Sequence, residues 1–212
     1  MGLNERLEHT MLKADATEEM ILRYCEEAKQ HRFRMVMVNG CHVKTVAGAL
    51  AETDVLTGCV VGFPLGQMTS VMKAAEAAGA ANDGARDIDM VMNIGAAKAG
   101  RWDVVTADIR AVVDAVPNDC VVKVIIETCL LTDEEKRRAV ACIVEGGADY
   151  VKTSTGFSTG GATEADVRLL REAAGGRLKV KASGGIRTKE QAEALIAAGA
   201  DTLGVGNAVL LI

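Results

Sequence analysis

The chain has 212 residues, of which 49% are hydrophobic and only 3% aromatic, and its formal net charge is −5. This length supports one large domain or two small ones, with a core built from aliphatic side chains. The acidic balance argues against a nucleic-acid-binding protein, which needs a basic surface. No stretch reaches the roughly 18 apolar residues of a membrane span, and the N-terminus has no apolar signal segment. We therefore expect a cytoplasmic protein with neither nucleic acid nor membrane as a partner.

The six cysteines are scattered and form no C-x-x-C motif, which indicates reduced residues of an intracellular protein. The three histidines are far apart. The adjacent pair Cys41-His42 has no partners at the spacing of a zinc site. We expect no metal.

Short apolar runs alternate with amphipathic segments along the chain. We predict strands at 6–9, 34–38, 55–61, 87–92, 121–126, 149–152, 178–181 and 202–205. We predict helices at 17–31, 41–50, 70–82, 102–116, 133–145, 164–174 and 189–198. Capping residues with acidic first turns mark several helix starts, and glycines mark several ends.

Eight strands that alternate with helices imply parallel pairing through crossover connections. A single-domain (β/α)8 TIM barrel over residues 1–212 fits this pattern best, with a short or truncated C-terminal helix because Ile212 follows the last strand closely. The alternative is an open doubly wound sheet. No G-x-G-x-x-G follows the first strand, which disfavours a dinucleotide-binding fold of that type.

Lys152 and Lys181 end neighbouring predicted strands, and small residues and glycine follow each of them. In a barrel of this type the reactive groups lie at the carboxyl ends of the strands. A protonated amine beside a second amine lowers the pKa of the second, and burial lowers it further, so such a pair can supply a nucleophilic lysine at neutral pH. The alternative is two surface lysines at strand ends.

Acidic residues and further lysines lie on the predicted strands. Alternation places Asp87 and Asp89 on one strand face, and a buried carboxylate needs a partner, for which we predict Lys181 as the partner of Asp89. Such a pair can relay protons or can be purely structural. We predict a structural ion pair for Lys123. Lys179 is expected to extend out of the N-terminal mouth of the barrel, the alternative being a side chain that faces the core.

Glycines gather in the loops after the last three strands. Loops at this position commonly bind phosphate through backbone N–H groups. Turn geometry alone is the competing explanation. The glycines are Gly156, Gly160, Gly161, Gly184, Gly185, Gly204 and Gly206.

Five segments at the predicted strand ends form longer motifs. They are Val151-Lys152-Thr153-Ser154-Thr155-Gly156-Phe157, Lys181-Ala182-Ser183-Gly184-Gly185-Ile186-Arg187, Glu127-Thr128-Cys129-Leu130-Leu131-Thr132, Gly62-Phe63-Pro64-Leu65-Gly66 and Asp87-Ile88-Asp89-Met90-Val91. Together these segments resemble the 2-deoxyribose-5-phosphate aldolase family, from about residue 9 to residue 204.

The resemblance implies a class I aldolase that needs no metal or cofactor. It would reversibly cleave 2-deoxy-D-ribose 5-phosphate to acetaldehyde and D-glyceraldehyde 3-phosphate. By resemblance, Lys152 forms the Schiff base, Lys181 is the second lysine, and Asp89 is the proton-relay acid. A homodimer or homotetramer is also implied. The implied phosphate-binding residues are Gly156, Gly184, Gly185, Gly204, Gly206 and Asn207.

Two departures from the family pattern bear on the site. Glu8 stands where the family usually has Asp, so we expect the supporting contact there to be longer or absent; Thr10 and Thr155 are further supporting residues. The turn 204–207 lacks the two serine hydroxyls of the family, which leaves backbone N–H groups and the Asn207 amide as donors. We therefore expect a weaker preference for phosphorylated substrate.

Two other functions remain open on the sequence. One is a phosphosugar isomerase or synthase on the same barrel, and the other is a non-catalytic phosphate-binding barrel. Turnover of deoxyribose 5-phosphate without metal or cofactor separates the aldolase from both.

Overall fold

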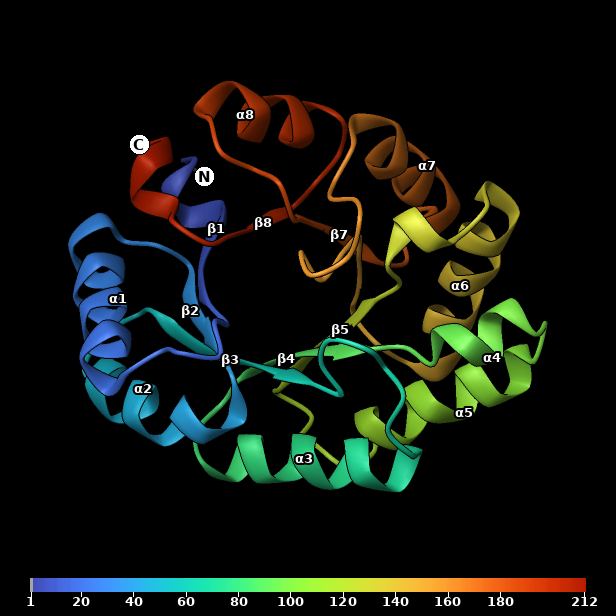
Figure 1. The fold of residues 1–212 in the computed structure, drawn as a ribbon, viewed down its shortest axis with the longest axis horizontal. Coiled ribbons are helices and arrows are strands. Elements are labelled where there is room, and N and C mark those ends of the chain that lie inside the picture. The colour runs from blue at the N-terminus through green and yellow to red at the C-terminus, as the bar shows by residue number, and fades with distance from the viewer. Residues whose placement is uncertain (1) are drawn as a thin grey trace.

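A computed structural model describes residues 2–212, and within them eight parallel strands close into one barrel (Figure 1). Each strand pairs with its neighbour in sequence, and the last strand closes the ring against the first. The predicted fold class is therefore confirmed. The strands are β1 Leu7–Met11, β2 Met35–Val38, β3 Leu56–Val61, β4 Asp87–Val91, β5 Val121–Ile125, β6 Tyr150–Lys152, β7 Lys179–Ser183 and β8 Thr202–Val205.

Helices surround the ring of strands on its outer side (Figure 1). The seven predicted helices are present as α1 Glu18–His31, α2 Val43–Leu50, α3 Ser70–Asn82, α5 Trp102–Val113, α6 Asp133–Gly146, α7 Glu164–Ala174 and α8 Lys189–Ala197. An unpredicted short helix, α4 Ile94–Lys98, precedes α5. Only the 3-10 helix η4 Ala208–Leu211 follows β8, which agrees with the short C-terminal element predicted. Three further 3-10 turns are η1 Asn4–Arg6, η2 Gly40–His42 and η3 Thr128–Leu130.

Helix starts follow the capping chemistry read from the sequence. The Thr132 side chain accepts a hydrogen bond from the backbone N–H of Glu135, whose carboxylate accepts one from the Thr132 backbone in return. Thr188 and Gln191 form the same reciprocal pair at α8. Each pair satisfies backbone donors that the first helical turn leaves unpaired, and so fixes where a crossover helix begins.

Side chains of each strand alternate between the barrel interior and the layer under the helices. In β4, Ile88 and Met90 belong to the aliphatic core shared with the helices, whereas Asp87 and Asp89 point into the barrel and meet lysines from β5, β6 and β7. The interior is therefore largely ionic where β4 to β7 face β1. Met35 and Met37 form a separate small apolar cluster.

Some predicted boundaries were wrong. β1 runs to Met11 because it stays paired with β2 as far as Val38. β7 extends to Ser183, and α5 ends at Val113, three residues before its predicted end. These differences matter little for the site: β7 continues two residues past Lys181, whose side chain is buried inside the ring against Asp89.

Candidate active site

Lys152 is the last residue of β6, and its side chain is 3% exposed. Its ammonium nitrogen lies 2.5 Å from Oδ2 of Asp89 on β4. The strand thus delivers an amine from the carboxyl end of the barrel into the interior, next to a carboxylate two strands away. Lys152 also lines the cavity at this end, so the amine is within reach of a small molecule bound there.

Lys181 on β7 contacts the same carboxylate oxygen, with its Nζ 2.6 Å from Asp89 Oδ2. Lys152 and Lys181 are direct partners in the register of β6 and β7. One oxygen atom of Asp89 therefore lies between two ammonium groups, and the structure brings together the three residues expected to carry the chemistry.

Burial lowers the pKa of Lys152 to about 8, with the Lys181 charge acting in the same direction and Asp89 against both. An amine of this pKa is about a tenth neutral at pH 7, whereas an ordinary lysine is neutral in about one molecule in 2,500. Burial is the larger cause, and the second amine is a further one. The sequence-based expectation named both.

Asp89 stays ionised in this environment. Burial alone would raise the pKa of its carboxyl, but Lys152, Lys181 and Lys123 together outweigh burial and hold the pKa below its usual value. The carboxylate can therefore accept a proton only transiently, which suits a relay between groups that each hold a proton more firmly.

Glu8 contradicts the expectation of a long or missing contact. Its carboxylate is fully buried, contacts Lys181 directly, and has its other oxygen 3.6 Å from Lys123 Nζ. The additional methylene of Glu carries the carboxylate from β1 across to β7 rather than away from it. Burial would raise the pKa of Glu8, but Lys123 and Lys181 bring it below the usual value.

Lys123 occupies the interior below the reactive pair. It contacts Asp87 directly and lies 3.6 Å from both Asp89 and Glu8, which agrees with the structural pairing predicted for it. These acids raise its pKa even though burial opposes them. Burial raises the pKa of Asp87 to about 6 in spite of Lys123. Lys179 is exposed at the start of β7, outside this group.

A cavity of about 240 Å³ opens at the carboxyl ends of β1, β6, β7 and β8. Five of the six residues expected to bind phosphate line it, together with Thr10 and Thr155. Asn207 does not: it is exposed, lies outside the lining, and its side chain does not cap η4. The lining glycines of the predicted phosphate site are Gly156, Gly184, Gly185, Gly204 and Gly206.

Two of these glycines are required by their surroundings. Gly184 has a φ of +84°, and a Cβ there would lie 3.2 Å from the Gly161 Cα. A Cβ on Gly204 would lie 3.0 Å from Cβ of Ser183 and 3.1 Å from Cε of Lys181. Gly204 therefore leaves room for the lysine side chain, a role that sequence reasoning about phosphate loops missed.

Three further residues at the site were given no role from the sequence. The Glu127 carboxylate accepts hydrogen bonds from the backbone N–H and the hydroxyl of Thr155, which fixes the loop after β6. Glu127 has a φ of +55°, uncommon for a residue with a side chain. Lys13 lines the cavity and adds a positive charge near the glycine loops. The Tyr24 hydroxyl donates to the Gly206 carbonyl at 2.6 Å and holds the turn after β8.

Thr10, the remaining supporting residue, donates its hydroxyl to the backbone carbonyl of Glu8 at 2.9 Å. It thus touches the Glu8 main chain rather than the reactive amines. Its position on β1 places it at the wall of the cavity.

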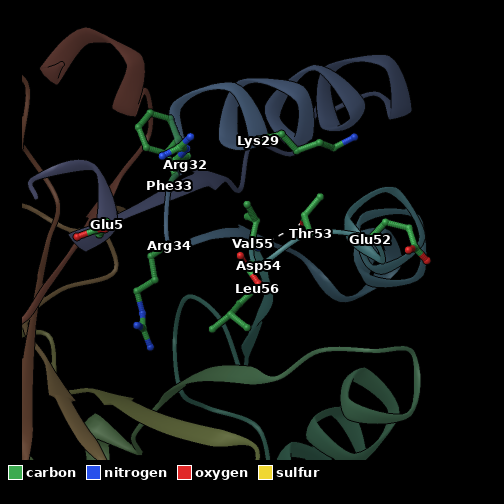
Figure 2. Close-up of a pocket in the computed structure, with 10 residues that line it drawn as sticks. All are labelled: Glu5, Lys29, Arg32, Phe33, Arg34, Glu52, Thr53, Asp54, Val55 and Leu56. Atoms are coloured by element: carbon green, nitrogen blue, oxygen red, sulfur yellow. Dashed lines mark hydrogen bonds between the residues drawn. The ribbon is translucent and has the colours of Figure 1, made fainter. Parts of the chain in front are cut away.

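A larger cavity, of about 590 Å³, lies at the opposite end of the barrel (Figure 2). Segments that precede β1, β2 and β3 line it, with Lys29, Arg32, Glu52 and Asp54 among their side chains. None of the sequence-predicted site residues lines it. Among residues 2–212 there is no group of three His, Cys, Asp or Glu side chains arranged to hold a metal ion. Nor does this part of the chain contain a helix long and apolar enough to cross a membrane.

Comparison with known proteins bears on this geometry. The profile described as DeoC/LacD family aldolase matches residues 7–211. The chain belongs to the DeoC/LacD family of aldolases. The predicted family and enzyme class, a lyase acting on carbon–carbon bonds, are thereby confirmed, and the small-molecule nature of its substrates follows.

Individual members of this aldolase family match over almost the entire chain. A protein named deoxyribose-phosphate aldolase from Geobacillus sp. (strain WCH70) is 53% identical over 211 residues, which cover 100% of this chain and 95% of the relative. One of the same name from Deinococcus radiodurans is 52% identical, covering 100% and 96%. The tetrameric deoxyribose phosphate aldolase from Aeropyrum pernix superimposes with a TM-score of 0.93 at 33% identity, covering 99% of this chain and 88% of that one.

Proposed function

We propose that this aldolase reversibly cleaves 2-deoxy-D-ribose 5-phosphate to acetaldehyde and D-glyceraldehyde 3-phosphate through a Schiff base on Lys152. The observation that carries the assignment is the Lys152 amine, which is buried, has a pKa of about 8, and faces the cavity beside the glycine loops. The substrate follows from relatives at 50% identity and above that bear the name of this activity.

The reaction begins when the neutral Lys152 amine attacks the C1 aldehyde; the adduct takes up one proton and loses water, which gives a protonated imine. Loss of the proton from the C3 hydroxyl lets the C2–C3 bond break, and the electron pair of that bond moves into the imine to give an enamine. D-Glyceraldehyde 3-phosphate departs. Protonation of the enamine carbon and hydrolysis then release acetaldehyde and restore Lys152. The imine itself is the electron sink, so we propose no metal or cofactor.

Asp89 and Lys181 are proposed to move the protons. Asp89 contacts both the reactive amine and Lys181, so a proton taken from the C3 hydroxyl has a short path to the enamine carbon. Positioned acid–base groups of this kind contribute about 10²–10⁴-fold to rate. Lys123 and Glu8 hold these groups in place rather than meeting substrate.

The phosphate is proposed to bind at the cavity wall formed by the loops after β6, β7 and β8. Backbone N–H groups at the glycines would donate to it, and Lys13 would add charge. The turn 204–207 offers no side-chain hydroxyl, and Asn207 lies outside the lining. We therefore propose that phosphorylated substrate is preferred only modestly.

The test combines product analysis with trapping. Purified protein given deoxyribose 5-phosphate should form acetaldehyde in the presence of EDTA, and Lys152→Ala should lose at least about a thousandfold in turnover. Borohydride added with acetaldehyde should leave a covalent adduct on the peptide that contains Lys152. An adduct confined to another lysine, such as the cavity residue Lys13, would contradict the assignment.

We also propose one catalytic domain over residues 1–212, a cytoplasmic location and a homodimer or homotetramer. The barrel uses strands from Leu7 to Val205 without an inserted unit, and all six cysteines are free thiols. Large apolar side chains such as Leu65, Val71 and Met72 are exposed on one segment, where subunit contact would cover them.

A further inference from the structure

Arg34 lies immediately before β2, at the end of the barrel opposite the catalytic cavity, and its side chain is 24% exposed. It lines the larger cavity, but Figure 2 shows its side chain extending away from those of Lys29 and Arg32. The cations of that cavity therefore do not converge on one point. Arg34 instead approaches the barrel interior, where its Nε lies 3.8 Å from Oε1 of Glu8.

Neither the Arg34 Nε nor the Glu8 Oε1 has a hydrogen-bond partner within residues 2–212, although both atoms are buried. The contact between these two atoms, at 3.8 Å, is therefore an ion pair rather than a hydrogen bond, and Lys123 faces the same Glu8 oxygen at 3.6 Å. The second oxygen of Glu8 contacts Lys181, which contacts Asp89, which contacts Lys152. A continuous series of charges therefore joins the N-terminal end of the barrel to the amine at the C-terminal end.

The charges of this interior do not balance if every group is ionised. Three carboxylates face four cations, so one positive charge is in excess. In a buried site an excess charge is disfavoured, and the group that can lose a proton with least cost does so. The carboxylates are Glu8, Asp87 and Asp89, and the cations are Arg34, Lys123, Lys152 and Lys181.

Other titratable groups near this interior do not alter the balance. Tyr150 on β6 is neutral at pH 7, since burial raises the pKa of its hydroxyl. Lys179 is exposed at the mouth, with its ammonium 5.5 Å from the Tyr150 ring. The facing residues of β2, β3 and β8, which include Met35, Met37, Gly58, Val60, Thr202 and Gly204, carry no charge.

We propose that Arg34 is a positioning residue that keeps the Lys152 amine neutral from the far end of the barrel by compensating Glu8. With Arg34 in place, the Glu8 charge is shared between Arg34, Lys123 and Lys181. Without Arg34, uncompensated negative charge favours the protonated form of the lysine that forms the Schiff base. This inference rests on the proposed function of Lys152.

The test measures how the rate of acetaldehyde trapping by cyanoborohydride, and kcat/KM, depend on pH in Arg34→Gln. Both should still rise with pH, but with a midpoint about one pH unit higher than in the unaltered chain. At pH 7 the rates should fall about tenfold, with little change at pH 9.5. Arg34→Lys, which keeps the charge, should restore most of the original midpoint.

Arg32→Gln is the matched control. This substitution removes a cation from the same cavity. Arg32 is exposed and has no contact with Glu8 among the described residues, so the pH midpoint of Arg32→Gln should match that of the unaltered chain. Glu8→Asp tests the route: if Arg34 acts through Glu8, the shift caused by Arg34→Gln should be smaller when the carboxylate has been shortened.

The outcomes separate a positioning role from a structural one. A lower thermal midpoint for Arg34→Gln with an unchanged pH profile would overturn the inference, as would an equal shift in Arg32→Gln. Arg34→Met keeps the aliphatic stem and replaces Arg34→Gln if that variant folds poorly. If the unaltered chain forms no Lys152 adduct, the proposed function fails; if it does and Arg34→Gln shows no shift, only this inference fails.

Discussion

The two ends of the barrel are both hollowed and both lined by charged side chains, yet only one holds the buried lysine to which we assign the chemistry. The cavity at the N-terminal end is the larger, at about 590 Å³ against about 240 Å³. Its lining charges are of both signs and come from surface segments before the strands. At the C-terminal end, a buried lysine with a lowered pKa faces glycine loops. A cluster of buried charged groups that shift one another's pKa identifies the site better than the volume of a cavity does.

The largest expected effect concerns the carboxylate that connects the two amines. Asp89→Asn should reduce turnover about 10²–10⁴-fold because the proton relay is lost. Trapping of acetaldehyde on Lys152 at pH 7 should persist, since removal of Asp89 also removes the group that favours the protonated amine. Steady-state kinetics and adduct mass spectrometry measure the two quantities. Equal loss of both would show that Asp89 acts only by holding Lys152 in place.

A smaller effect is expected from crowding Lys181. A Cβ in Gly204→Ala would press on the Lys181 side chain, and we expect a loss of about 10- to 100-fold in kcat. Overpacking should also cost about 1–3 kcal/mol of unfolding free energy. Gly206→Ala is the control for crowding, because a Cβ there meets no atom within 4 Å and the backbone N–H proposed to donate to phosphate is kept. Similar losses in both variants would mean that the turn, rather than the lysine, is sensitive.

The smallest effect tests the difference between the two ends directly. Glu52→Trp places a large ring in the N-terminal cavity, and kcat/KM should stay within about twofold because the residue is exposed and distant from Lys152. Thr10→Trp, at the wall of the smaller cavity, should block substrate. If Glu52→Trp impaired the enzyme as strongly as Thr10→Trp, the larger cavity would have a functional role that its geometry does not indicate.

Much of this architecture could be predicted from the sequence, because parallel strands repeat a local pattern. The relative positions of Lys152, Lys181 and Asp89 were predicted correctly. Each lies either at a strand end or on the strand face that alternation of side chains assigns to it. Helix α4 was missed because five residues are too few for periodicity; its start is fixed by the Asn93 side chain, which accepts a hydrogen bond from the Ala96 N–H.

The predictions that were wrong concern contacts that depend on how far a side chain reaches. The supporting contact of Glu8 was expected to be longer or absent, but the curvature of a closed ring brings β1 and β7 within reach of one long side chain, and Glu8 contacts Lys181. Arg34 was given no role, because it is the first residue of a predicted strand and nothing in its neighbours indicates that it turns inward. Asn207 was assigned to phosphate by its place in a motif, whereas the turn directs it outside the cavity.

The ion pair between Glu8 and Lys181 joins residues that are 173 positions apart in the sequence. During synthesis Glu8 leaves the ribosome long before its partner does, at about 5–20 residues per second. Until β7 and β8 arrive and the ring shuts, its carboxylate must remain hydrated. A nascent chain that lacks the last two strands therefore cannot bury its charged centre, so the enzyme gains its interior and its activity in the same late step.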